Sequence, residues 1–239
     1  MIEMARRFLR QRLGSLAMTI ALGVLVLLTG AQATDDPERA LGTGFLALAL
    51  IAAGSVSRDV SGGAIQMILA RPIRRTSYLF GRFAGVLAAY AAFLLASAAA
   101  AIAFRTLLRR AFRAAPLDPG LPALARGAAA GLANALLFSA ILLFFSTFLR
   151  GYADVLAYFV LLGTLGFLPN LGRQLGRPGL ARAGEALRDN VLPQVEWGAV
   201  FRGERIAGEP TGRFVLAVVA FLALAVFVFS RREFSYGQD

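Results

Sequence analysis

The sequence predicts an all-α integral membrane protein, because apolar residues dominate it, they form long runs, and basic residues flank those runs. Of the 239 residues, 58% are apolar and 16% are charged, and the mean hydropathy is +0.66. A soluble domain is about half apolar and a quarter charged. All 25 basic residues are arginines, and they gather at the ends of the runs, where lipid headgroups lie. Within lipid such runs form helices, since helices satisfy their own backbone hydrogen bonds.

Six runs are long enough to cross a bilayer, which takes about 20 apolar residues with roughly 17 to 25 tolerated. The second run is short and lies between Arg39 and Arg58. The six predicted spans cover residues 13–32, 40–57, 83–104, 127–149, 152–171 and 214–230. The sequence has no internal repeat, low-complexity tract or linker that we detect. We therefore expect a single transmembrane domain over residues 1–239.

The N-terminal residues predict an amphipathic helix that lies in the headgroup plane before the first span. Apolar side chains share one helical face, and arginines lie elsewhere around the helix: Met1, Met4, Ala5, Phe8 and Leu9 against Arg6, Arg7 and Arg10. The alternative is a signal peptide, since Ala31-Gln32-Ala33 resembles a cleavage site. The apolar run is longer than a usual signal-peptide core, which favours an uncleaved span.

Six spans place both termini on one side of the membrane, and four arginines before the first span place that side in the cytosol. One outer loop runs against this rule. It begins with four arginines that we expect to meet lipid headgroups or, alternatively, an anionic lipid or substrate headgroup: Arg105, Arg109, Arg110 and Arg113.

Three absent residue types exclude several kinds of chemistry. Without cysteine the chain has no thiol nucleophile or thiolate metal site. Without histidine it has no imidazole base. Without lysine it has no phosphate-binding loop of the G-x-x-x-x-G-K-[ST] type, so any ATP must be bound by another polypeptide. We expect no enzyme activity, cofactor or metal in this chain.

The segment between the second and third spans is the most informative part of the sequence. Gly62-Gly63 permits a sharp change of direction, and Pro72 ends any helix that follows. Arginines come next, at the level of anionic headgroups. The pattern predicts a short helix parallel to the membrane, with apolar side chains that can fill a groove elsewhere: Ile65, Met67, Ile68 and Leu69. The alternative is an amphipathic loop that rests on lipid.

This segment resembles the first cytosolic loop of ABC transporter permeases of the ABC-2 type. The similarity lies in an acid at Asp59, a glycine at Gly63, an apolar stub, Arg-Pro-Ile-x-Arg over residues 71–75 and Gly-Arg at 81–82. The family usually has Glu at the position of Asp59 and Lys at that of Arg82, and both exchanges keep the charge. The layout of the whole chain is similar too, with an N-terminal amphipathic helix, six spans and a long last outer loop.

The resemblance implies that this segment is a coupling helix, which docks in a cleft of a separate ATPase subunit. The implied contact residues are Asp59, Gly63, Ile65, Gln66, Met67, Ile68, Leu69, Arg71, Pro72, Arg74 and Arg75. It further implies two ATPase copies carrying ATP and Mg, a second permease subunit in a homodimer or heterodimer, and a prokaryotic plasma membrane. No nucleic-acid partner is expected. The uncharged spans favour an amphipathic or lipid-linked substrate over a small ion.

Three further features have two readings each. Asp154 begins the fifth span, where an acid suits the helix dipole, although intramembrane acids also mark ion paths. Phe167–Asn170 indicates either a plain helix stop or a re-entrant end. Glu185 and Asp189, one turn apart in a predicted helix near 180–189, suit acid–base chemistry, but adjoining arginines favour a salt-bridged surface.

Two alternative functions stay open at this point. One is an integral membrane enzyme that acts on lipid headgroups, with its site in the outer loop over residues 172–213. The other is a non-catalytic membrane scaffold. A transporter subunit differs from both in its stable association with an ATPase.

Overall fold

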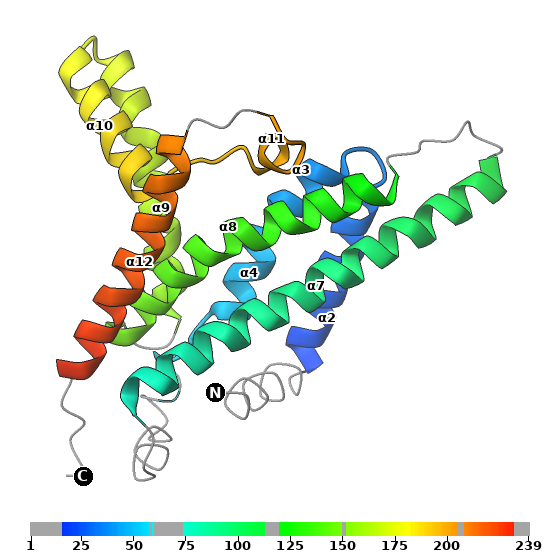
Figure 1. Cartoon of the computed structure of the whole chain (residues 1–239), viewed down its shortest axis with the longest axis horizontal. Coiled ribbons are helices and arrows are strands. Elements are labelled where there is room, and N and C mark those ends of the chain that lie inside the picture. Colours follow the sequence, from blue (N-terminus) through cyan, green and yellow to red (C-terminus); the bar gives the residue numbers. More distant parts are fainter. Residues whose placement is uncertain are drawn as a thin grey trace. The chain divides into compact units, whose positions relative to one another are not determined.

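In the computed structural model, helices make up most of the described part of the chain, which comprises residues 16–57, 59, 74–112, 120–149, 152–204 and 208–231. The helices are α2 (Leu16–Gln32), α3 (Pro37–Gly42), α4 (Phe45–Ala52), α7 (Arg75–Phe112), α8 (Leu121–Phe148), α9 (Ala153–Gln174), α10 (Pro178–Val191), α11 (Trp197–Phe201) and α12 (Gly208–Arg231) (Figure 1). The predicted N-terminal amphipathic helix and the predicted coupling helix lie outside these residues.

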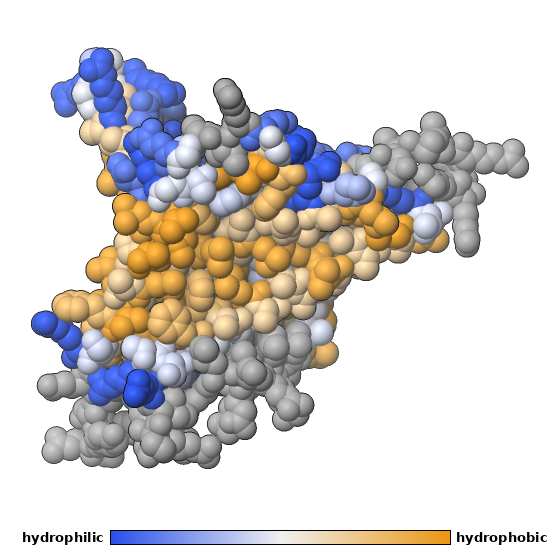
Figure 2. Space-filling view, viewed as in Figure 1, coloured by the Kyte–Doolittle hydropathy of each residue, from blue (hydrophilic) through white to orange (hydrophobic). Residues whose placement is uncertain are grey.

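Four of the described helices are long and apolar enough to cross a membrane: α7, α8, α9 and α12. They correspond to the third, fourth, fifth and sixth predicted spans, so the all-α, multi-pass class of the protein is confirmed. The described part of α2 is apolar but has 17 residues. Along α12 the outward residues Val215, Leu216 and Val219 are more than half exposed, and the surface over this helix is hydrophobic (Figure 2).

The second predicted span is not one continuous helix. Asp36 caps α3 by accepting a hydrogen bond from the amide of Arg39 at 3.0 Å, and α3 ends at Gly42. The eight residues of α4 follow, and the chain then turns at Gly54, whose φ of 62° favours glycine. Most of α4 is buried in the protein. Hydropathy alone does not distinguish a helix buried in protein from a helix that faces lipid. The sequence therefore predicted one membrane span over residues 40–57.

The fifth predicted span does not stop at Phe167–Asn170, because α9 passes through Pro169 and ends at Gln174. Membrane helices tolerate an internal proline when nearby groups satisfy the freed backbone atoms. The predicted helix near 180–189 is confirmed as α10, which packs against α9. The pair is joined by a salt bridge between Arg173 and Glu185.

The described residues fall into two compact units. Unit 1 comprises those within Met1–Ala52, Phe80–Ser139 and Glu196–Arg205, and unit 2 comprises those within Ala53–Leu79, Ala140–Val195 and Ile206–Asp239. Helices α7 and α8 contribute residues to both units, so the division does not follow the order of the chain.

Small residues bring the helices of unit 1 close together. A Cβ atom added to Gly131 of α8 would collide with the carbonyl oxygen of Leu41 and would lie 3.2 Å from Leu94. Such close approach is typical of helix packing in membranes, where small residues let backbones meet.

We predict that Gly131→Ala lowers the thermal stability of the purified protein. The backbone at Leu41 must move to admit the methyl group, and overpacking of this kind costs about 1–3 kcal/mol. The matched control is Gly163→Ala in α9, where an added Cβ meets nothing within 4 Å. The control should be neutral or stabilising, because alanine favours a helix more than glycine does. Equal melting temperatures for the two variants in detergent would contradict the assigned contact.

Candidate functional site

The segment singled out by the sequence lies mostly outside the described residues, but the structure describes the chain at both of its ends. Asp59 precedes the segment and is buried, with 3% of its surface exposed. Arg74 and Arg75 follow it and are exposed. The remaining predicted contact residues lie outside the described part of the chain: Gly63, Ile65, Gln66, Met67, Ile68, Leu69, Arg71 and Pro72.

A hydrogen bond joins the two ends of this segment. The hydroxyl of Tyr78, in the first turns of α7, donates to Oδ2 of Asp59 at 2.6 Å. Tyr78 is fully buried, and its ring stacks on Phe229 of α12 with the centroids 5.7 Å apart. A hydrogen bond to a carboxylate is stronger than a neutral one. This bond therefore holds Asp59, which precedes the segment, against the first turns of α7, which follow the segment.

A buried turn leads into Asp59, and side chains from two other helices satisfy its amide groups. Oδ2 of Asp154 accepts from the amide of Gly54 at 2.8 Å. Oγ of Ser146 accepts from the amides of Val56 and Ser57, at 3.0 and 3.1 Å. Buried amides without partners are rare because they are costly. We call the three turn residues, their two acceptors and the pair Asp59–Tyr78 the anchor cluster. All of its members lie in unit 2: Gly54, Val56, Ser57, Asp59, Tyr78, Ser146 and Asp154.

Asp154 thus has a structural role, as a hydrogen-bond acceptor for the buried turn. It is fully buried in the first turn of α9, where the helix dipole favours a negative charge. Its Oδ1 also accepts from the amide of Val155 at 2.8 Å.

The first turn of α7 is also tied to the last turn of α12. Nη1 of Arg75 donates to the carbonyl oxygen of Ser230 at 2.8 Å. A cation at a helix C-terminus is favoured by the helix dipole and satisfies a carbonyl that has no partner within the helix. The return end of the segment is therefore bound to a second helix of unit 2.

A second polar cluster, the Glu38 cluster, lies in unit 1. Glu38 accepts from Arg126 and Arg202, both at 2.8 Å. Nε1 of Trp197 donates to Oδ1 of Asn134 at 2.9 Å. Exposed ion pairs of this type contribute little to stability, but together these contacts join α3, α8 and α11.

The charges of the Glu38 cluster are mutually compensated. A hydrogen bond with Glu204 at 2.7 Å raises the pKa of Arg202, and the same bond lowers the pKa of Glu204. Both groups therefore stay charged at neutral pH. This arrangement suits a scaffold rather than a proton-transferring site.

The four outer arginines are only partly described. Nη2 of Arg105 donates to the carbonyl oxygen of Ala33 at 2.9 Å, which caps the end of α2. Arg109 and Arg110 belong to the end of α7, but their side chains, like Arg113 as a whole, lie outside the described residues. At least one of the four is thus held by the protein itself.

The two acids considered for acid–base chemistry are paired with arginines. Glu185 forms its salt bridge with Arg173, and Asp189 lies 3.1 Å from Arg188. Among the described residues no group of three or more His, Cys, Asp or Glu side chains is arranged to hold a metal ion.

Sequence reasoning missed Tyr78 and Ser146 as members of the anchor cluster. Ser146 carried a weak signal, since Ser146-Thr147 interrupts an otherwise apolar run. Tyr78 carried no such signal. No family model matches the chain, and no curated protein matches it. Its function is therefore argued from the residues themselves.

We predict that Asp154→Ala lowers the free energy of unfolding by about 1–3 kcal/mol, because it leaves the buried amide of Gly54 without its acceptor. The measurement is thermal or denaturant unfolding in detergent. The control is Glu209→Ala, which removes an exposed ion pair with Arg213 and should change stability by less than about 0.5 kcal/mol. Asp154→Ala as stable as this control would refute the assigned anchor.

Proposed function

We propose that this chain is the membrane-spanning permease subunit of an ATP-driven ABC exporter of the ABC-2 type. In this proposal it forms part of the translocation pathway and couples to a separate ATPase subunit through the segment over residues 59–82, of which residues 75–82 begin α7. The chain lies in a prokaryotic plasma membrane as one domain with six spans and both termini in the cytoplasm.

The observation that carries the proposal is the closure of this loop by Tyr78 and Asp59. A partner that displaces the loop also moves the membrane helices only if the base of the loop is rigid. The anchor cluster supplies such a base, since it ties the loop to α8 and α9, and Arg75 ties it to α12. Rigid packed elements pass on displacements that flexible loops absorb.

The grouping of polar residues supports the six-span order, although residues 40–57 form no single helix. The order assigns residues 54–59, 74–78, 146, 154 and 230 to the cytosolic side, and hydrogen bonds pair residues of this group with one another. It assigns Glu38, Arg126 and Arg202 to the outer side, and both arginines bind Glu38. On this order the broken second span still crosses the membrane, as two short helices and a turn.

The proposed partners are two copies of the ATPase and a second permease subunit, either identical or related. ATP and Mg are bound by the ATPase, and this chain supplies the contact surface. The proposed contact residues within the loop are the apolar side chains Ile65, Met67, Ile68 and Leu69. Asp59 is buried, so we assign it to orienting the loop rather than to touching the partner.

We predict that Met67→Asp with Leu69→Asp abolishes co-purification of the ATPase, because two charges would enter an apolar groove. The assay is affinity purification of the chain expressed together with its ATPase partner, with membrane fractionation to verify insertion. Met67→Leu with Leu69→Met keeps the apolar character and should retain the partner. An inserted acidic variant that still holds the ATPase would exclude this docking surface.

We predict that Tyr78→Phe keeps the ATPase bound but lowers the substrate transported per ATP hydrolysed. Phenylalanine preserves the stack on Phe229 and removes the hydroxyl that Asp59 accepts. The measurement is transport and hydrolysis in the same proteoliposomes, with Tyr152→Phe at an exposed position as the control. If Tyr78→Phe transports as much substrate per ATP hydrolysed as the wild-type protein, that result would count against the proposed role of the hydrogen bond between Tyr78 and Asp59. Turnover of lipid by the chain alone in detergent would instead favour a membrane enzyme.

A further inference from the structure

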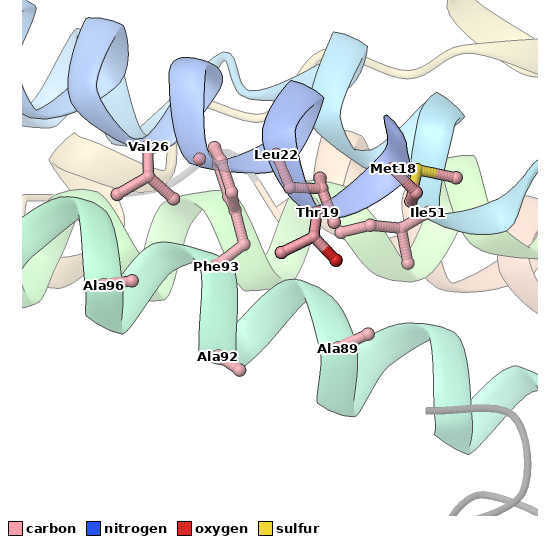
Figure 3. Close-up of a pocket in the computed structure, with 10 residues that line it drawn as sticks. Met18, Thr19, Leu22, Val26, Ile51, Ala89, Ala92, Phe93 and Ala96 are labelled. Carbon is pink, nitrogen blue, oxygen red and sulfur yellow. The ribbon is translucent and has the colours of Figure 1, made fainter. Parts of the chain in front are cut away.

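An apolar pocket of about 300 Å³ lies within unit 1, between α2, α4 and α7 (Figure 3). Met18, Leu22 and Val26 of α2 face it from one side, and Ile51 of α4 adjoins them. Phe93 of α7 lies on the other side. The pocket opens to the surface of the unit, because Gly23 and Ala92 in its lining are exposed.

Small residues create this space. Ala89, Ala92 and Ala96 lie at positions i, i+3 and i+7 of α7, so they share one helical face toward α2. Opposite them, a Cβ atom added to Gly23 would meet nothing within 4 Å. By contrast, a Cβ added to Gly30, two turns further along α2, would lie 2.7 Å from the Cβ of Ala100. The two helices touch at that level and separate at the level of the pocket.

The lining excludes water and ions as occupants. The side-chain hydroxyl of Thr19 is the single polar side-chain group among the lining residues, and a buried water needs two to four polar partners. Apolar cavities of roughly 150 Å³ stay dry and take up small hydrocarbons. A larger apolar pocket is therefore suited to a hydrocarbon.

The surroundings point to one source of hydrocarbon. The neighbouring residues Leu16, Ile20 and Val24 of α2 are at least half exposed, so an apolar surface borders the opening. In a multi-pass membrane protein an exposed apolar surface of this kind meets lipid chains. A chain that enters the pocket gains contact with Phe93, Leu22 and Ile51 on several sides.

We propose that this pocket binds one acyl chain of a membrane phospholipid as a retained ligand, distinct from the exchanging lipids around the protein. The inference does not depend on the proposed transport function, because it needs neither an ATPase nor a substrate. The bound chain fills the space that the three alanines and Gly23 leave between α2 and α7.

The test uses the full chain in vesicles of phosphatidylethanolamine and phosphatidylglycerol, with a trace of phospholipid that carries a photoactivatable diazirine on its acyl chain. Cross-linked residues are mapped by mass spectrometry. We expect labelling of Met18, Leu22 and Phe93 well above that of Val215 and Leu216, which lie on the exposed surface of α12.

Gly23→Leu should lower labelling of the pocket residues roughly tenfold, because the new side chain occupies the place of several methylene groups. Labelling of α12 should not change. The matched control is Gly163→Leu, which adds the same side chain in open space on α9 and should leave pocket labelling as it is. If Gly23→Leu does not fold, Ala92→Val replaces it as the test variant, because valine narrows the pocket from the side of α7.

Pocket labelling equal to that of α12 in the wild-type protein would overturn the proposal. Pocket labelling unchanged by a folded Gly23→Leu or Ala92→Val variant would overturn it as well. Loss of ATPase association bears only on the proposed transport function, so the two proposals fail separately.

Discussion

A backbone that leaves the helical conformation inside an apolar protein must find new hydrogen-bond partners for its amide groups. The rest of this structure depends on how that requirement is met. The break after α4 is the place where it arises. Three amides of the turn at 54–57 are accepted by two side chains, Asp154 and Ser146, that come from later helices. The turn is buried, so removal of either acceptor leaves an amide unpaired where water does not reach. The break is thereby held at one place.

That fixed turn determines where the next segment can begin. Two residues later Asp59 is buried and accepts from Tyr78, and Arg75 binds the last turn of α12. A buried carboxylate is costly unless donors surround it, so Asp59 in turn holds Tyr78 in position. The ring of Tyr78 adds its stack on Phe229. Each contact therefore constrains the next, and four helices take part in the base of the loop: α7, α8, α9 and α12.

Run length and charge position were enough to predict the four long helices, because a span is set by bilayer thickness. The helix predicted near residues 180–189 corresponds to α10. The broken second span was not predictable, since α4 is as apolar as a lipid-facing helix but is buried in protein. Asp154 stood out as an acid in an apolar run, yet its partner Gly54 lies 100 residues away in the chain. Residues so far apart in the chain are brought together by tertiary packing. No local pattern in a single sequence predicts which of them will pair.

The structure also bears on the arginines that run against the rule for cytoplasmic charge. Three of the arginines that the six-span order assigns to the outer side are engaged within unit 1: Arg105 caps α2 at Ala33, while Arg126 and Arg202 bind Glu38. Each therefore has a structural reason for its position.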